Sequence, residues 1–215
     1  MKKIAVCILM AAVLAAGILG GLGQVKPQPQ PASAAEEMTG ITADIQAITT
    51  QPHVAGSPEN RAVRDMIVER ANLLGLKAEV LLFELNIPAF IADWQQEYDE
   101  ASNYERNQIE NYISSLGYST LEELVRGNLN AADIDVLPLD NVLIKINGTA
   151  PQGTVMFVSH YDSVITAPGA GDDALAAACM LNLMESMAKN PPQNDVYFLF
   201  TDGEEVGLLG AADFV

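Results

Sequence analysis

Cysteine is scarce in this chain of 215 residues. One of its two cysteines, Cys7, lies within an apolar run at the N-terminus, so Cys179 is the only one beyond it. A single cysteine cannot form an internal disulfide, and a position among Ala and Met on an expected helix predicts a buried, small apolar side chain. The shortage of thiols also excludes a metal site built from cysteine.

Basic residues are also few, with 11 Lys and Arg against 28 Asp and Glu and a formal net charge of −17. All 28 acidic residues but only 8 of the basic ones lie after residue 35. Proteins that bind nucleic acid neutralise phosphates with Lys and Arg, so this balance argues against a nucleic-acid partner. It suits an extracytoplasmic protein, and the length allows one sizeable α/β domain.

The first 35 residues have the pattern of an export signal. Two lysines precede an uncharged apolar run at residues 4–23, and a Pro/Gln-rich spacer follows. Ala32-Ser33-Ala34 resembles a cleavage site, yet the run of 20 residues also matches the ~20 residues that span a bilayer. We therefore expect residues 1–35 to be a signal peptide or membrane anchor with a spacer, and the protein to be secreted or anchored through residues 4–23.

Strands and helices are expected to alternate over residues 36–215. Ser57 and Pro58 have the pattern of a helix start, and Gly75 marks that helix's end. Further helices are expected at 37–50, 172–189 and 206–215, and strands at 77–85, 141–146, 154–159 and 196–201. This order predicts a three-layer α/β/α fold with a mostly parallel central sheet, whose ligands lie beyond the carboxyl ends of the strands.

Residues 93–139 interrupt this alternation. They contain 10 acidic and 2 basic residues and two expected helices, the second starting at a capping box, Ser119-Thr-Leu-Glu122. We interpret the segment as an insertion between strands. The favoured interpretation is a solvent-exposed helical segment with no binding role, and the alternative is a lid or a surface for a partner.

Acidic and imidazole side chains follow two of the expected strands. His160 and Asp162 lie on one side of an extended segment, so His160 could bind a metal while Asp162 accepts from its other ring nitrogen. Taken alone, this motif is more often a histidine satisfied within the protein. Asp172 and Asp173 follow at a helix start, where one of them could simply cap the helix.

Glu204 and Glu205 give the sharpest signal, because they directly follow an apolar strand. Adjacent carboxylates raise each other's pKa unless a cation lies near them. One glutamate could bind a metal and the other transfer protons, although a solvated acidic turn is an equal alternative for this motif alone. Imidazole and carboxylates together suit Zn²⁺, with Mn²⁺ and Co²⁺ as alternatives.

Such an ion would lower the pKa of bound water from ~15.7 to about 7. A glutamate that accepts the water's proton adds roughly 10²–10⁴-fold in rate. The implied chemistry is hydrolysis of an amide or related bond.

Three segments together resemble the zinc aminopeptidases of peptidase family twenty-eight: His160-Tyr-Asp-Ser-Val, Gly171-Asp-Asp, and Phe198-Leu-Phe-Thr-Asp-Gly-Glu-Glu-Val-Gly-Leu-Leu-Gly210. The resemblance extends from about Asn141 to Val215, and His53 to Asn60 is similar to the start of membrane-anchored members. The resemblance implies two zinc ions: His160 would bind one, Glu205 would bind the other, and Asp172 would bridge both. It implies that Glu204 is the general base and that Asp162 orients His160. Asp173 would be structural, through a strained peptide bond with Asp172.

The chain departs from the family in two places. Alanines at 174 and 176–178 stand where the family has Gly or Asn and then Ser-Gly, and we expect little loss of metal binding from this change. The family completes its site with a later Asp and His, whereas the chain ends 10 residues after Glu205. We expect residues 36–215 to be the N-terminal part of a metallopeptidase domain that alone binds zinc poorly and hydrolyses nothing.

The predicted function is hydrolysis of peptide bonds outside the cytoplasm by an aminopeptidase that removes N-terminal residues. Peptides would be the substrates. The alternatives are a non-catalytic ectodomain of the same fold, used for binding or assembly, and a carboxypeptidase or cyclase relative.

Overall fold

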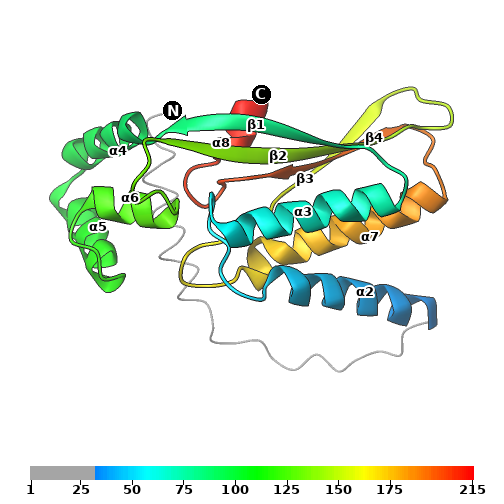
Figure 1. Cartoon of the computed structure of the whole chain (residues 1–215), viewed down its shortest axis with the longest axis horizontal. Helices are drawn as coiled ribbons and strands as arrows, with labels where there is room; N and C mark the ends of the chain where they lie inside the picture. Colours follow the sequence, from blue (N-terminus) through cyan, green and yellow to red (C-terminus); the bar gives the residue numbers. More distant parts are fainter. Residues whose placement is uncertain (1–31) are drawn as a thin grey trace.

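The computed structural model describes residues 32–215, with side chains from residue 40 (Figure 1). The apolar run expected to be a signal or anchor lies outside the described residues. Within residues 32–215, no helix combines the length and apolarity needed to cross a bilayer.

The centre of the described structure is a four-stranded sheet in the order β1-β2-β4-β3. Its strands are β1 (Ala78–Asn86), β2 (Val136–Ile146), β3 (Thr154–His160) and β4 (Asp195–Thr201). Only the β3–β4 pair is parallel, while β1–β2 and β2–β4 are antiparallel. The predicted mostly parallel sheet is therefore wrong for the described strands, and the sheet is mixed.

The connections explain these strand directions. A helical crossover through α7 (Leu175–Lys189) joins β3 to β4, which gives parallel pairing. β1 and β2 are instead the two arms of a hairpin, with Asn86 opposite Val136 at the end where residues 87–135 connect the two strands. β2 is longer than the strand expected at 141–146 because it pairs with β1 over its whole first half.

Three helices cover one face of the sheet: α2 (Ala32–Ile48), α3 (Pro58–Leu73) and α7 (Figure 1). The buried core on this face includes Ile67, Val142, Ile144, Leu181, Met184, Phe198 and Phe200. Phe157 of β3 stacks on Phe198 with 5.5 Å between ring centroids. Its neighbours Met156 and Val158 therefore point to the opposite face, where they are 41% and 54% exposed.

The short helix α8 (Leu209–Phe214) lies on the other face of the sheet, opposite α3 and α7 (Figure 1). Within residues 32–215, it forms the second helical layer of the expected three-layer fold. This helix begins at Leu209 instead of Val206, because Gly203, Glu204 and Glu205 lead into a loop that returns to β4. The backbone N–H of Gly210 closes the loop on the carbonyl of Asp202 at 2.8 Å.

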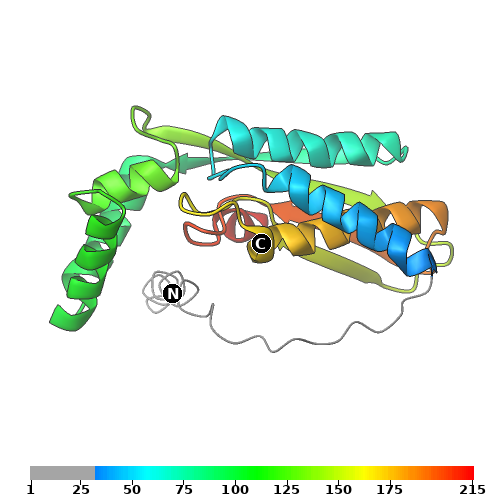
Figure 2. The same cartoon turned by 90° about the horizontal axis from the view of Figure 1, so that it is seen from below.

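The insertion forms three helices instead of two: α4 (Ile87–Glu100), α5 (Asn103–Ser115) and α6 (Leu121–Asn128). They extend from one end of the sheet (Figure 2) and enclose a small core of Ile109, Ile113, Leu121 and Leu124. The helices begin at Ile87 and not at Asp93, because the Asn86 side chain caps α4. Residues 136–139, expected within the insertion, belong to β2.

Two helix starts differ in detail from the expected pattern. The capping box lies at Ser102 and Glu105, at the start of α5. Thr120, and not Ser119, caps α6.

Helix α3 begins as the sequence predicts. The Oγ of Ser57 accepts from the backbone N–H of Asn60 at 3.0 Å, and Pro58 occupies the first turn. Gly75 follows the helix with a φ of +74°, a conformation that favours glycine.

Helix α7 differs from expectation in two ways. Its regular part begins at Leu175, because Ala170–Ala174 form a separate short turn in which Asp172 and Asp173 have non-helical backbone angles. Cys179 is exposed, so its predicted burial is wrong. It lies one turn after the exposed Leu175, on the side of α7 that faces away from the core.

Candidate metal centre

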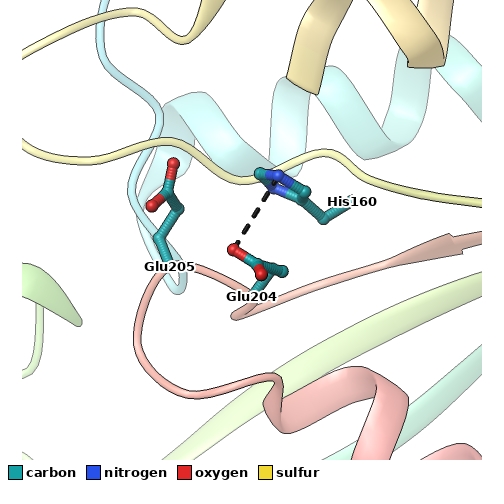
Figure 3. A group of neighbouring side chains, drawn as sticks. All are labelled: His160, Glu204 and Glu205. Atoms are coloured by element: carbon teal, nitrogen blue, oxygen red, sulfur yellow. Dashed lines mark ion pairs between the residues drawn. The ribbon is translucent and has the colours of Figure 1, made fainter. Parts of the chain in front are cut away.

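The predicted site residues lie together at one edge of the sheet, because β3 and β4 run parallel and end side by side. His160 is the last residue of β3 and lies opposite Thr201, the last residue of β4. Glu204 and Glu205 follow β4 after the turn at Asp202 and Gly203. Figure 3 shows their carboxylates and the His160 ring around one shared space.

His160, Glu204 and Glu205 form a compact group of potential metal ligands. One ring nitrogen of His160 and one carboxylate oxygen from each glutamate all lie within 4.8 Å of one another. Asp172 approaches the same imidazole from another side, with its Oδ1 3.2 Å from Nε2 of His160. The Nε2 atom is also 3.8 Å from Oε2 of Glu204, so the carboxylates of Asp172 and Glu204 both approach it.

Asp162 orients His160 and also holds the two glutamates. Nδ1 of His160 lies 3.0 Å from the backbone oxygen of Asp162 and 3.3 Å from its Oδ1. Both neighbours only accept hydrogen bonds, so Nδ1 carries a hydrogen and Nε2 faces the cluster. The sequence predicted the carboxylate as the partner of the ring, whereas the closer acceptor is the main-chain oxygen.

The Asp162 carboxylate accepts from the backbone N–H groups of Glu204 at 3.0 Å and Glu205 at 3.1 Å. It is almost fully buried, at 1% exposure. One side chain after β3 therefore fixes the backbone of both glutamates after β4. Sequence reasoning did not find this contact, because it joins residues 42 and 43 positions apart.

Asp173 lies beside the cluster and contacts β3. Its Oδ2 accepts from the Ser159 hydroxyl at 2.9 Å, and the peptide bond between Asp172 and Asp173 is cis. The contact holds the turn that carries Asp172 against the end of β3. Asp172 itself is open to solvent, with a side chain that is 74% exposed.

Asp202 is a further buried acid that sequence reasoning placed only in a turn. It is 2% exposed. Its Oδ1 accepts from the Asn60 amide at 3.0 Å and from the backbone N–H of Gly203 at 2.9 Å. This contact ties the start of α3 to the end of β4 across 142 positions. In the sequence, the only local indication of a special role for Asp202 was the Asp-Gly pair directly after an apolar strand.

Glycine is required where α8 returns to β4. A Cβ added at Gly210 would overlap the Oδ1 of Asn141 and approach the backbone oxygen of Asp202 to 2.6 Å. The Asn141 amide donates to the Gly210 carbonyl at 2.8 Å, so the close approach supports a hydrogen bond. The loop carrying Glu204 and Glu205 is thus fixed at both of its ends.

The charges at the site are strongly unbalanced. Burial and the charges of Asp162 and Asp172 raise the pKa of Glu205 to about 8, and burial also raises the pKa of Glu204. Burial lowers the pKa of His160, but Asp162, Glu204 and Asp172 outweigh it and raise that pKa to about 10. Crowded carboxylates around one imidazole raise the free energy of the ionised site, and a cation among them lowers it.

The donor set fits a zinc ion. Imidazole nitrogen and carboxylate oxygen are typical zinc ligands in catalytic sites, and no described cysteine lies at this edge of the sheet. His160, Glu204 and Glu205 are the residues placed to hold metal here, and Asp172 contacts the same imidazole. The structure brings together all five predicted functional residues, with Asp173 next to them.

Comparison with known proteins agrees with this geometry. Residues 141–215 match the model of Peptidase family M28. Among curated proteins, a vacuolar membrane protease of Lachancea thermotolerans is 32% identical over 173 residues, which is 80% of this chain and 16% of that protein. A vacuolar membrane protease of Laccaria bicolor is 29% identical over 191 residues, 88% of this chain and 15% of that protein. The chain spans about one sixth of the length of these relatives.

Solved structures show the same fold. The aminopeptidase from Aneurinibacillus sp. strain AM-1 aligns with a TM-score of 0.57 and 18% identity, covering 82% of this chain and 65% of that one. BSAP, a zinc aminopeptidase from Bacillus subtilis, gives 0.55 and 14%, covering 87% and 65%. A glutaminyl cyclase from an Acidobacteriales bacterium gives 0.51 and 15%, covering 86% and 50%. The described residues thus have an α/β fold of the zinc-exopeptidase type.

Proposed function

The chain belongs to peptidase family M28, and on this basis we propose that the protein is a zinc-dependent aminopeptidase that removes N-terminal residues from peptides. The observation that carries the proposal is the convergence of His160, Glu204 and Glu205 within 4.8 Å at the edge of the sheet. The names of the structural neighbours, two of which are aminopeptidases, support the choice of reaction.

The residues divide the chemistry among them. His160, Asp172 and Glu205 would hold zinc, which would lower the pKa of a bound water and polarise the carbonyl of the scissile bond. Glu204 accepts a proton from the attacking water and returns it to the leaving amine. Asp162 keeps Nε2 of His160 directed into the site and fixes the backbone of both glutamates.

We also propose that the protein acts outside the cytoplasm, secreted or anchored through residues 4–23. Supporting this are the leader-like composition of those residues and the membrane proteases among its relatives.

The roles of the two glutamates can be separated by substitution in the whole protein. Glu204→Gln should lower kcat on aminoacyl substrates by roughly 10²–10⁴-fold, because the general base is lost, while zinc content stays at the parent level. Glu205→Gln should lose both zinc and activity. Glu79→Gln, an exposed position in β1, is the matched control.

The measurements are steady-state kinetics and metal analysis of the same preparations. Loss of zinc from Glu204→Gln would overturn the assignment of Glu204 as base. Cyclisation of N-terminal glutamine without hydrolysis of any peptide would favour the cyclase alternative and overturn the proposed reaction.

A further inference from the structure

The segment that leads into α3 contacts the loops that follow both strands of the candidate site. At one end of this segment, the backbone N–H of His53 donates to the Oγ of Ser163 at 2.9 Å, and the Ser163 N–H donates back to the His53 carbonyl at 3.3 Å. At the other end, the Asn60 amide donates to Oδ1 of Asp202 at 3.0 Å. Residues 53–60 therefore hold the loop after β3 and the loop after β4 together.

The contact between Asn60 and Asp202 is buried, with 2% exposure at each residue. A carboxylate removed from water is stable only when donors surround it. Asp202 has three such donors: the Asn60 amide, the backbone N–H of Gly203 at 2.9 Å and the backbone N–H of Asp140 at 3.4 Å. Asn60 is the only side chain among these three donors, so it is the one that a substitution can remove.

The Asp202 carboxylate sets the turn that precedes Glu204. Gly203 forms this turn with a φ of +68°. Its N–H donates to the same oxygen that accepts from the Asn60 amide. One oxygen atom thus joins α3 to the turn, and the next residue along the chain is the proposed general base.

Helix α3 also reaches Asp202 by a second route. Arg64 lies one turn after Asn60 on the same side of α3 and forms an ion pair with the Asp140 carboxylate. The backbone N–H of Asp140 donates to Oδ2 of Asp202. Both oxygens of Asp202 are therefore linked to α3, one directly and the other through β2.

We propose that Asn60 is a positioning residue that aligns Glu204 for proton transfer by holding the Asp202 carboxylate. The inference rests on the proposed peptidase function and deepens it, because it gives a residue of α3 a role in that reaction. A general base works only within hydrogen-bond reach of the proton that it accepts, and a misplacement of about 1 Å can lower a rate roughly 100-fold.

The first experiment removes the amide in the whole protein. Asn60→Ala should lower kcat on aminoacyl substrates at least tenfold, with KM within twofold of the parent. Zinc content should stay at the parent level, because Asp162 still holds the backbone of the proposed ligand Glu205. Arg61→Ala is the control, since this neighbouring side chain donates to the Gly56 carbonyl at 2.7 Å and should leave kcat unchanged.

The second experiment exchanges the two side chains. Asn60→Asp sets two buried carboxylates against each other and should lower kcat at least as far as Asn60→Ala. Adding Asp202→Asn restores a donor and an acceptor in reverse order, so the double variant should regain at least fivefold in kcat over Asn60→Asp. The double variant should also stay within tenfold of the parent, whether or not the single variants fold. A role in filling space alone would give no recovery, because the side-chain volumes hardly change.

The third experiment does not require catalysis. Hydrogen exchange of the whole protein, followed by mass spectrometry, reports on the loop after β4, where the N–H groups of Gly207 and Leu208 donate to the Glu204 carbonyl. Asn60→Ala should raise exchange in this loop at least tenfold and leave the N–H groups of β4 at parent rates. The double variant should return the loop towards parent rates. A cooperative urea transition shows that each variant compared is folded.

The outcomes separate the two proposals. If peptides are hydrolysed and Asn60→Ala has the same kcat as Arg61→Ala, the positioning role fails and the peptidase proposal stands. If no peptide is hydrolysed but loop exchange rises in Asn60→Ala and falls back in the double variant, Asn60 holds the loop and the proposed reaction fails. Loss of zinc together with activity in Asn60→Ala, or no recovery in the double variant, overturns the role assigned to Asn60.

Discussion

At the scale of single residues, Asp162 connects the two halves of the candidate site. It lies after β3 and fixes Glu204 and Glu205 after β4 through their backbone N–H groups, while its main-chain oxygen and carboxylate face Nδ1 of His160. It is a positioning residue, since it holds the groups that would contact metal and water.

Asp162→Asn should therefore weaken the site without removing a ligand. We expect about 10–100-fold lower zinc affinity or activity, because an amide cannot accept both glutamate N–H groups and the ring loses a charged neighbour. Zinc titration and a pH profile of kcat/KM check this, since a merely structural change would leave the profile's shape unaltered.

Asp65→Asn is the control for this change, because the side chain of Asp65 is 68% exposed. Parent-like zinc affinity and an unaltered pH profile in Asp162→Asn would show that the carboxylate contributes nothing to the site beyond its shape.

The clustering of His160, Asp172, Glu204 and Glu205 could be predicted from the sequence, because acidic and imidazole residues directly follow apolar strands. The contacts that hold them could not. Asp162 meets Glu204 and Asn60 meets Asp202 only once the strands have been ordered in the sheet, and local periodicity carries no information on that order.

At the scale of elements, the start of α3 shows where local signals suffice. Ser57, Pro58 and Gly75 mark the helix through backbone chemistry within a few residues, and the structure confirms all three. The sequence contains no such signal for the strand directions, because an apolar strand has the same pattern whether its neighbour runs parallel or antiparallel to it. The insertion's bounds shifted because Asn86 can cap a helix as well as end a strand.

Removing the cap should destabilise the fold measurably. Ser57→Ala is expected to lower the free energy of unfolding by about 1 kcal/mol, the usual cost of a lost N-cap. Urea unfolding followed by circular dichroism measures it. Ser115→Ala, at the exposed end of α5, serves as the control; an equal effect at both positions would contradict the specific role of the cap.

At the scale of the whole molecule, the insertion is the loop of the β1–β2 hairpin. Asn86 and Val136 are paired, so the 49 residues between them leave and return at one point of the sheet. The α/β class followed from the strand and helix pattern, but the mixed sheet and the packing of the insertion depended on contacts far apart in sequence.

Replacing residues 87–135 with an Asn-Gly turn tests this arrangement. A two-residue turn suits paired antiparallel ends, so β1 and β2 should stay paired. The variant should lose about 3–6 kcal/mol of stability, because Leu137 and Leu139 become exposed where the insertion now covers them. Urea unfolding measures the loss.

A deletion variant as stable as the parent would contradict the shared packing of insertion and sheet. Circular dichroism shows whether the strands persist, and a cooperative transition is the condition for comparing the two free energies.

The parallel pairing of β3 with β4 also sets when the metal centre can form. His160 meets Glu204 and Glu205 only after α7 has crossed over and β4 has aligned beside β3, a pairing of strands about 40 positions apart. Such nonlocal pairings form late, since the entropy of closing the intervening chain must first be overcome. A ribosome has to synthesise the chain beyond Glu205 before the cluster can assemble, so zinc capture would report that β3 and β4 have paired.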